Sequence, residues 1–175
     1  MKTIHILIFL LFFSFSCSNR QKGEDETISI TSIIKKQAIE IATGYAKSRF
    51  KDSISTTANG GITWITDKQK MYEINPNKIF IGNIDADSTA DALITLNTSY
   101  GTEPGDAEHL IMVNKNGKLT LAKSFVMDLK ILSLRDKIFS GEIHTKPRSS
   151  PLYNCEECRA IIRYKFTNGD TVRIE

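Results

Sequence analysis

The sequence predicts an α+β fold, in which one N-terminal helix is followed by a mainly antiparallel β-meander sheet. Three observations lead to this class. Apolar residues recur at helical spacing between residues 30 and 46. Short β-type segments separated by turn residues fill the chain after that. Asn-Gly pairs at 116–117 and 168–169 each predict a two-residue hairpin turn, which joins neighbouring antiparallel strands.

The predicted helix covers about residues 32–51. Thr31 or Ser32 is its expected N-terminal cap. Gly44 lowers the stability of a helix by about 1 kcal/mol relative to Ala, so close packing against a neighbour is the expected reason for its presence. The stripe that we expect to be buried consists of Ile30, Ile34, Ala38, Ile41, Ala42, Tyr45 and Ala46.

Turn residues divide the rest of the chain into candidate strands. Breaks are predicted at Asn59-Gly60-Gly61 and at Asn75-Pro76-Asn77. Between residues 159 and 166 one face is apolar and the other is mostly charged, which predicts a strand that is buried on one face. The predicted inward residues are Ala160, Ile162, Tyr164 and Phe166, which alternate with Ile161, Arg163 and Lys165. The candidate strands cover residues 62–65, 79–81, 92–96, 109–115, 118–125, 128–134, 137–143, 159–166 and 171–174.

Length and composition predict one ordinary domain. The chain has 175 residues, with 41% apolar and 25% charged residues, which are globular values that argue against disorder and against several membrane spans. The formal net charge is only +3, and basic and acidic residues are interspersed. A nucleic-acid-binding surface needs clustered Lys and Arg, so no nucleic acid partner is expected. The predicted domain covers residues 29–175.

Residues 1–16 have the architecture of a signal peptide. Met1-Lys2 supplies a positive start, and Ile4 to Phe13 is apolar except for His5. A helix that spans a bilayer needs about 20 apolar residues. Because this run has about half that length, we expect a removable leader rather than a permanent transmembrane anchor.

The end of the leader resembles a bacterial lipoprotein signal, because the small residue Ser16 stands directly before Cys17. The resemblance implies cleavage after Ser16 and acylation of Cys17, and more than one acyl chain would hold the protein on a membrane. The sequence departs from the family at Ser14, where Leu is usual. The alternative is an ordinary secretory leader cut at the same bond, with Cys17 incidental.

Residues 17–28 are predicted to form a flexible tether behind the lipid anchor, because most of them are polar. In the lipoproteins that this chain resembles, Ser18 after the Cys is compatible with sorting to the outer membrane. The expected location is therefore the bacterial cell envelope, with the exported domain anchored at the outer membrane.

The segment GNIDADSTADALITL, residues 82–96, resembles the calcium loops of FG-GAP and VCBS-type repeats and, more distantly, those of dockerins and EF-hands. In such loops alternate side chains turn inward, so that several oxygens reach one Ca²⁺. The resemblance implies Ca²⁺ ligands at positions one, three, five and nine, with one backbone carbonyl at position seven. These positions are Asn83, Asp85, Asp87, Asp91 and Thr89, the last through its carbonyl.

Three departures from the calcium-loop pattern predict weak affinity. Asn83 replaces the usual first Asp, Ser88 stands where Gly is usual, and Ile94 occupies the place of the bidentate Glu. An affinity in the millimolar range would match weak extracellular modules. The alternative is a turn whose Asp and Asn side chains satisfy nearby backbone N–H groups.

Cys155 and Cys158 have C-x-x-C spacing, which allows three interpretations. The favoured one is a structural disulfide, because an exported protein meets an oxidising compartment; so small a loop contributes only about 2 kcal/mol. A redox pair would need a helix N-terminus to lower the pKa of the first thiol, whereas the following residues predict a strand. A zinc site would have to recruit His109 or His144.

Two function classes remain from the sequence. The first is a non-catalytic, membrane-anchored domain with weak Ca²⁺ binding, which either binds an envelope protein or glycan or has a structural role in stabilising an assembly at the membrane. The alternative is a small hydrolase or thiol-redox accessory enzyme that uses loop 101–109 or the Cys pair. No nucleophile elbow or phosphate-binding glycine motif is present in the sequence. A pocket in which two ionisable side chains converge would favour the enzyme.

Overall fold

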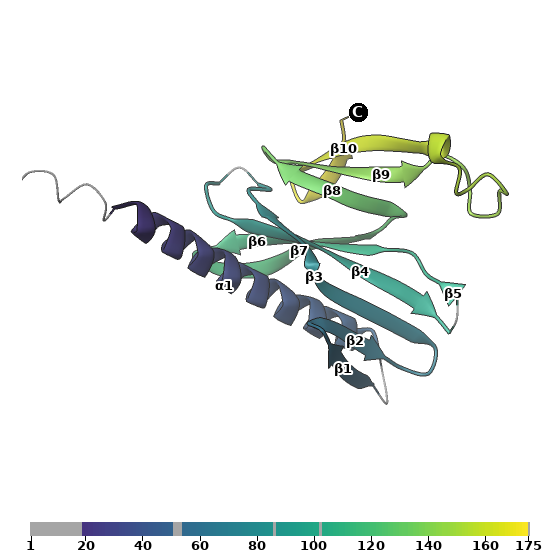
Figure 1. Ribbon diagram of the computed structural model, residues 1–175, viewed down its shortest axis with the longest axis horizontal. Helices are drawn as coiled ribbons and strands as arrows, with labels where there is room; N and C mark the ends of the chain where they lie inside the picture. The colour runs from purple at the N-terminus through teal and green to yellow at the C-terminus, as the bar shows by residue number, and fades with distance from the viewer. Residues whose placement is uncertain (1–18, 51–53, 86, 102, 175) are drawn as a thin grey trace, which may run out of the picture. The chain divides into compact units, whose positions relative to one another are not determined.

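The computed structural model describes residues 19–50, 54–85, 87–101 and 103–174 (Figure 1). Helix α1 is followed by strands that all pair antiparallel in these residues, which confirms the predicted α+β class. The elements are α1 (Asn19–Ser48), β1 (Ser55–Asn59), β2 (Ile62–Thr66), β3 (Lys70–Gly82), β4 (Asp91–Tyr100), β5 (Glu103–Pro104), β6 (Glu108–Lys115), β7 (Lys118–Val126), β8 (Leu129–Arg135), β9 (Ile138–His144), the short 3₁₀ helix η1 (Glu156–Cys158), β10 (Arg159–Thr167) and β11 (Asp170–Arg173).

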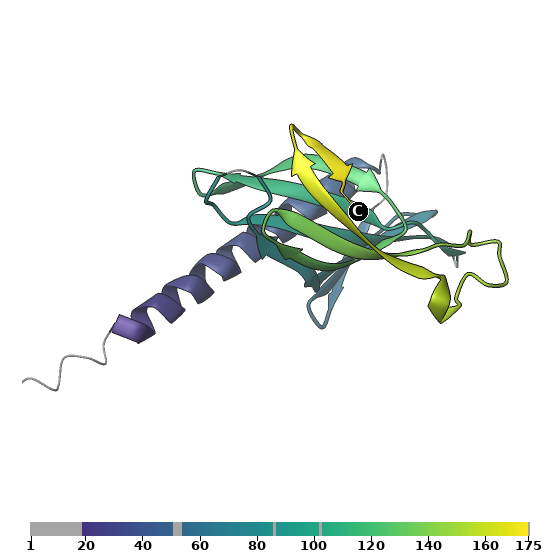
Figure 2. The same cartoon turned by 90° about the horizontal axis from the view of Figure 1, so that it is seen from above.

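The strands form two sheets rather than the single sheet that the sequence predicted. Sheet A has the order β1-β2-β3-β4-β6-β7, with β5 paired to β4, and sheet B has the order β11-β10-β9-β8. The chain leaves sheet A after β7 and enters sheet B at β8. Sheet B lies over one face of sheet A (Figures 1 and 2).

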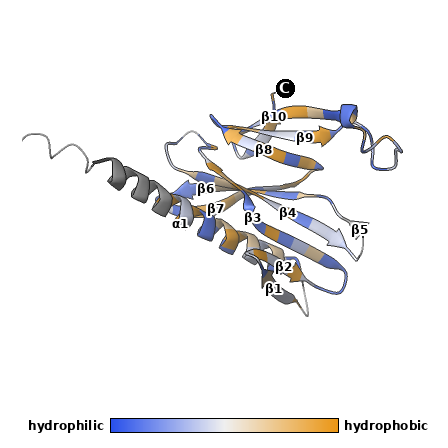
Figure 3. Ribbon diagram, viewed as in Figure 1, coloured by the Kyte–Doolittle hydropathy of each residue, from blue (hydrophilic) through white to orange (hydrophobic). Residues whose placement is uncertain are grey.

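Strands β4 and β6 explain why two layers cover sheet A. Both are buried along most of their length, because alternate residues face opposite sides of the sheet and both sides are apolar. One side packs against Ile34, Ala38, Ala42 and Ala46 of α1. The other side forms a second core with residues of sheet B, and the banding of β8 and β10 in Figure 3 reflects their one buried face.

Helix α1 begins at Asn19, so the predicted start near residue 32 and the predicted caps Thr31 and Ser32 are wrong. Residues 19–28, predicted as a flexible tether, are helical, while the signal peptide and Cys17 lie outside the described residues. Ile30 is exposed and does not belong to the buried stripe.

The chain divides into compact units at Ile33/Ile34, a few residues after the predicted domain start at residue 29. In the described residues, no helix is both long and apolar enough to cross a membrane.

The predicted hairpin turns are confirmed by their backbone conformation. Asn116-Gly117 and Asn168-Gly169 have positive φ at both positions, as a type I′ turn requires. The predicted break at 75–77 is instead a β-bulge inside β3, because the pairing with β4 shifts between Ile74 and Ile79. A bulge accommodates Pro76, which has no N–H to donate to a neighbouring strand.

Candidate functional site: the acidic loop and two grooves

The loop between β3 and β4 brings three carboxylates together. One side-chain oxygen from each of Asp85, Asp87 and Asp91 lies within 4.8 Å of the others. The loop ends where Asp91 begins β4, next to β6, so the adjacent core holds one end of the cluster in place. The sequence therefore predicted correctly which carboxylates meet.

Asp91 is completely buried and ties the loop to sheet A. Its Oδ2 accepts hydrogen bonds from the backbone N–H groups of Ile84 (2.7 Å) and Asp85 (3.2 Å), and its Oδ1 accepts one from Asn114 (2.8 Å). Burial raises the pKa of Asp91, although the three N–H groups act in the opposite direction. Asp91 is thus part of the structure as well as a potential ligand.

Asp85 and Asp87 also stabilise the turn by accepting hydrogen bonds from backbone N–H groups within it. The Oδ1 atom of Asp85 accepts a hydrogen bond from the backbone N–H of Asp87 (3.0 Å), and Oδ1 of Asp87 accepts one from that of Thr89 (2.7 Å). The Thr89 hydroxyl lies 2.6 Å from the same Asp87 oxygen, and these contacts lower the pKa of Asp87. The contacts of Thr89 with this cluster are made through its backbone N–H and hydroxyl. The geometry is therefore compatible with the turn interpretation as well as with a cation site.

Two buried amide oxygens, one in the acidic loop and one on the neighbouring strand β6, have no hydrogen-bond donor among the described residues. They are Oδ1 of Asn83, the first predicted ligand, and Oδ1 of Asn114 on β6. Asn114 is 93% buried, and its Nδ2 donates to the carbonyl of Ala90 (3.1 Å). A buried carbonyl oxygen without a hydrogen-bond donor costs free energy. A cation that bound either oxygen as a ligand would remove this cost.

A groove of about 770 Å³ opens beside the acidic loop, and we call it the lysine groove. The charged residues that line it are Asp85, Asp87, Lys115, Lys137 and Lys165. The sequence analysis missed this groove, because its three lysines come from β6, the β8–β9 turn and β10. No local sequence pattern predicts that residues so far apart in the sequence line the same groove.

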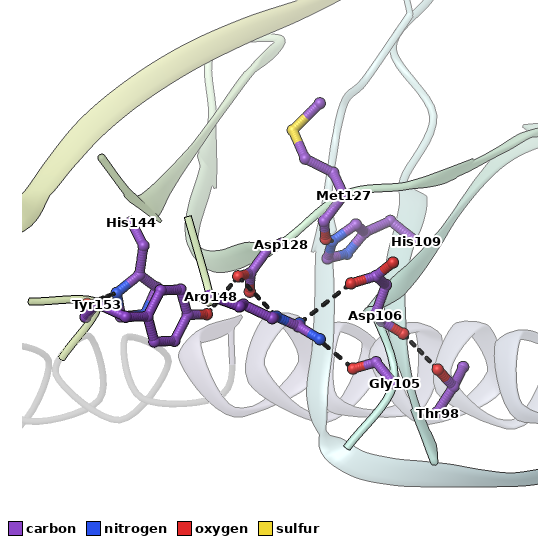
Figure 4. A network of polar contacts seen from close by, with 9 residues as sticks. All are labelled: Thr98, Gly105, Asp106, His109, Met127, Asp128, His144, Arg148 and Tyr153. Atoms are coloured by element: carbon purple, nitrogen blue, oxygen red, sulfur yellow. Dashed lines mark hydrogen bonds and ion pairs between the residues drawn. The ribbon is translucent and has the colours of Figure 1, made fainter. Parts of the chain in front are cut away.

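A second groove of about 490 Å³ lies between the sheets and carries a network of polar contacts (Figure 4). Arg148 pairs with Asp106 (3.1 Å) and Asp128 (3.4 Å), and the hydroxyl of Tyr153 donates to Asp128. Burial opposes the ionisation of Asp128, but Tyr153 and Arg148 outweigh it and lower the pKa of this carboxyl. Two ionisable side chains thus converge, yet near neutral pH their mutual pairing keeps both charged, which is unsuited to proton transfer.

Both histidines of the domain have structural contacts. His109 is buried; its Nε2–H donates to the carbonyl of Met127 (3.2 Å), and its Nδ1 accepts from the Thr95 hydroxyl (3.0 Å). The Nδ1–H of His144 donates to the carbonyl of Tyr153 (2.7 Å), and the two rings stack. Neither histidine joins a group of three or more metal-ligating side chains in the described part of the chain.

Cys155 and Cys158 lie at bonding distance and form a disulfide, as the structural interpretation predicts. Cys155 directly precedes η1, and Cys158 is its last residue. This helix has only three residues and leads directly into β10. The α-helix N-terminus that activates a redox thiol is therefore missing at this described position.

In comparisons with known proteins, no family model, no curated protein and no solved structure matches the chain. The geometry of the candidate site is therefore the basis for the proposed function.

Proposed function

We propose that this chain is an exported protein, anchored to the bacterial cell envelope through acyl chains on Cys17, whose folded part is a non-catalytic binding domain with a weak Ca²⁺ site. The anchor is supported by the leader, in which Ser16 precedes Cys17 after a short apolar run. Binding is favoured over catalysis because Arg148 and Asp128, which converge in the second groove, form an ion pair. This pairing keeps both side chains charged and is unsuited to proton transfer.

The observation that carries the Ca²⁺ proposal is the acidic loop. The oxygens of Asp85, Asp87 and Asp91 lie within 4.8 Å of one another, and the buried Oδ1 of Asn83 has no donor among the described residues. Ca²⁺ takes six to eight oxygen ligands, so it suits such a set. The backbone N–H groups already bound to Asp91 compete for its lone pairs, which agrees with an affinity in the millimolar range.

Thermal unfolding with and without Ca²⁺ tests the metal site. With a Kd of about 1 mM, 10 mM Ca²⁺ stabilises the folded state by about 1.4 kcal/mol. We therefore expect the Tm to rise by about 3–6 °C. Asp87→Asn is expected to abolish this rise. Asp67→Asn is the matched control, because Asp67 also accepts backbone N–H groups in an exposed turn but lies outside the cluster. An unchanged wild-type Tm at 10 mM Ca²⁺ would contradict the site.

Mass spectrometry of the N-terminal peptide from native membranes tests the anchor. The expected species begins at Cys17 and carries acyl chains, and Cys17→Ser is expected to release the protein into the soluble exported fraction. An unmodified Cys17 thiol, or a leader still attached to a cytosolic protein, would show that the anchor proposal is wrong.

A further inference from the structure

We propose that the lysine groove binds acidic oligosaccharides, whose carboxylates pair with Lys115, Lys137 and Lys165, and that Ca²⁺ in the acidic loop strengthens this binding. The first part names the ligand of the binding domain, and the second part rests on the proposed Ca²⁺ site. The groove volume of about 770 Å³ lies within the range of ligand-binding clefts.

The three lysines make the groove attractive to anions. The ion pairs between described residues use other cations, so the ammonium groups of Lys115, Lys137 and Lys165 have no carboxylate within salt-bridge distance there. Lys115 and Lys165 are exposed, and Lys137 is half-buried. An ammonium group is a compact point charge with rotatable donors, which suits single carboxylates spaced along a chain.

The acidic loop makes the charge of the groove depend on Ca²⁺. Three lysines and the two lining carboxylates Asp85 and Asp87 sum to 3 − 2 = +1. A bound Ca²⁺ would raise this sum to +3, so an anionic ligand would bind more tightly. A cation in the loop could also accept ligand oxygens directly, since Ca²⁺ coordinates both carboxylate and hydroxyl oxygens.

The walls of the groove favour a sugar over a peptide. A peptide that binds as an added strand needs a regular strand edge. The edge strand β7 contributes only Ala122, which is the extra residue of a β-bulge because Leu121 and Lys123 pair with the consecutive residues Met112 and Ile111. The β10–β11 turn contributes Thr167 and Asn168, whose hydroxyl and amide groups can bind sugar hydroxyls.

Isothermal titration calorimetry of the full chain in detergent tests this proposal with three probes: trigalacturonate, neutral maltotriose and triglutamate. We expect trigalacturonate to bind in EDTA and to bind at least 5-fold more tightly in 5 mM Ca²⁺, a typical coupling between two sites. Maltotriose and triglutamate are expected to bind at least 10-fold more weakly.

Charge-removing variants locate the binding. The triple variant Lys115→Gln, Lys137→Gln, Lys165→Gln is expected to lose at least 10-fold in affinity for trigalacturonate. Lys68→Gln, which removes an exposed lysine from the β2–β3 turn, is expected to change nothing. Equal urea midpoints show that the variants are folded. Asp87→Asn removes a negative charge from the groove wall. This variant is therefore expected to bind trigalacturonate in EDTA at least as tightly as the wild type, and to lose the enhancement by Ca²⁺.

The possible failures are distinguishable. Absence of trigalacturonate binding in both buffers, equal binding of maltotriose or triglutamate, or full affinity in the triple variant would each overturn the oligosaccharide site. Binding in EDTA without enhancement by Ca²⁺ would overturn only the coupling. A Tm that does not respond to Ca²⁺ would overturn the proposed metal site while leaving the lysine groove intact.

Discussion

Gly44 and Gly141 both lie inside regular elements, but their surroundings differ. The expected close packing at Gly44 is wrong, because a Cβ there would meet no atom within 4 Å other than those of its chain neighbours and its own helix backbone. A Cβ at Gly141 would overlap Cδ1 of Leu129 and lie 3.0 Å from the carbonyl oxygen of Lys130. The reason for a glycine therefore depends on neighbours that the local sequence does not reveal.

We predict opposite effects of alanine at these two positions. Gly44→Ala is expected to stabilise the fold by about 1 kcal/mol, because Ala reduces the backbone entropy lost on helix formation. Gly141→Ala is expected to destabilise it by about 1–3 kcal/mol through overpacking. Urea unfolding measures both, and effects of the same sign would contradict the packing described for one of the two sites.

We predict that the burial of His109 lowers the free energy of unfolding in acid. Burial lowers its pKa to about 4, against weaker opposing effects of the Met127 carbonyl and Glu108, whereas the unfolded chain has a pKa of about 6.5. Above pH 6.5 both states are neutral, and the contribution of His109 is fully present. Between pH 6.5 and 4 the unfolded state binds the proton first, so at pH 5 about 2 kcal/mol is lost.

The measurement compares the pH dependence of unfolding in wild-type protein and in His109→Gln. Other acidic groups, including Asp128, add to the acid sensitivity of both proteins. The wild type is therefore expected to lose about 2 kcal/mol more than the variant between pH 7 and pH 5. Identical losses would mean that His109 is accessible to protons in the folded protein.

At the scale of elements, the end of α1 is fastened to β6 through a charged contact. Tyr45 donates a hydrogen bond to the carboxylate of Glu108, and Arg49 lies 3.1 Å from the same carboxylate. Glu108 is only 5% exposed, whereas the Arg49 side chain is half-exposed. The sequence did not reveal that Tyr45 and Arg49 contact Glu108, since about 60 residues separate Glu108 from the other two.

Arg49→Ala is expected to destabilise the fold by about 1.5 kcal/mol, near the lower end for a hydrogen bond to a charged group, because solvent already reaches Arg49. Lys47→Ala is the matched control: it removes an exposed cation from the last turn of the same helix. Urea unfolding of both variants measures the difference, and equal effects would show that the contact with Glu108 contributes nothing.

The hairpins show how far local sequence determines an element. Asn116-Gly117 and Asn168-Gly169 form the predicted turns, and the inward residues of β10 are those that the alternation predicted. The Asp136-Lys137 turn also has positive φ at both positions, although neither residue is Gly. Its conformation is imposed by the pairing of β8 with β9, a tertiary effect that overrides local preference.

For the whole molecule, the unit that begins at Ile34 contains both cores. A chain that begins at residue 31 is therefore expected to unfold with the same free energy as one that begins at residue 19, within about 0.5 kcal/mol. Urea unfolding of the two chains provides the measurement. A larger loss in the shorter chain would mean that residues 19–30 contribute to the folding of the domain.

The sequence by itself determined the α+β class, most strands, two hairpin turns and the aspartates that meet in the acidic loop. These features depend on periodicity, turn dihedrals and ligands a few residues apart, all of which act over short stretches of chain. Only the tertiary structure decided the split into two sheets, the bulge at Pro76 and the lysine groove. Each of these features depends on pairing or packing between segments that are distant in the sequence. Lys115, Lys137 and Lys165, for example, line one groove only because the two sheets stack.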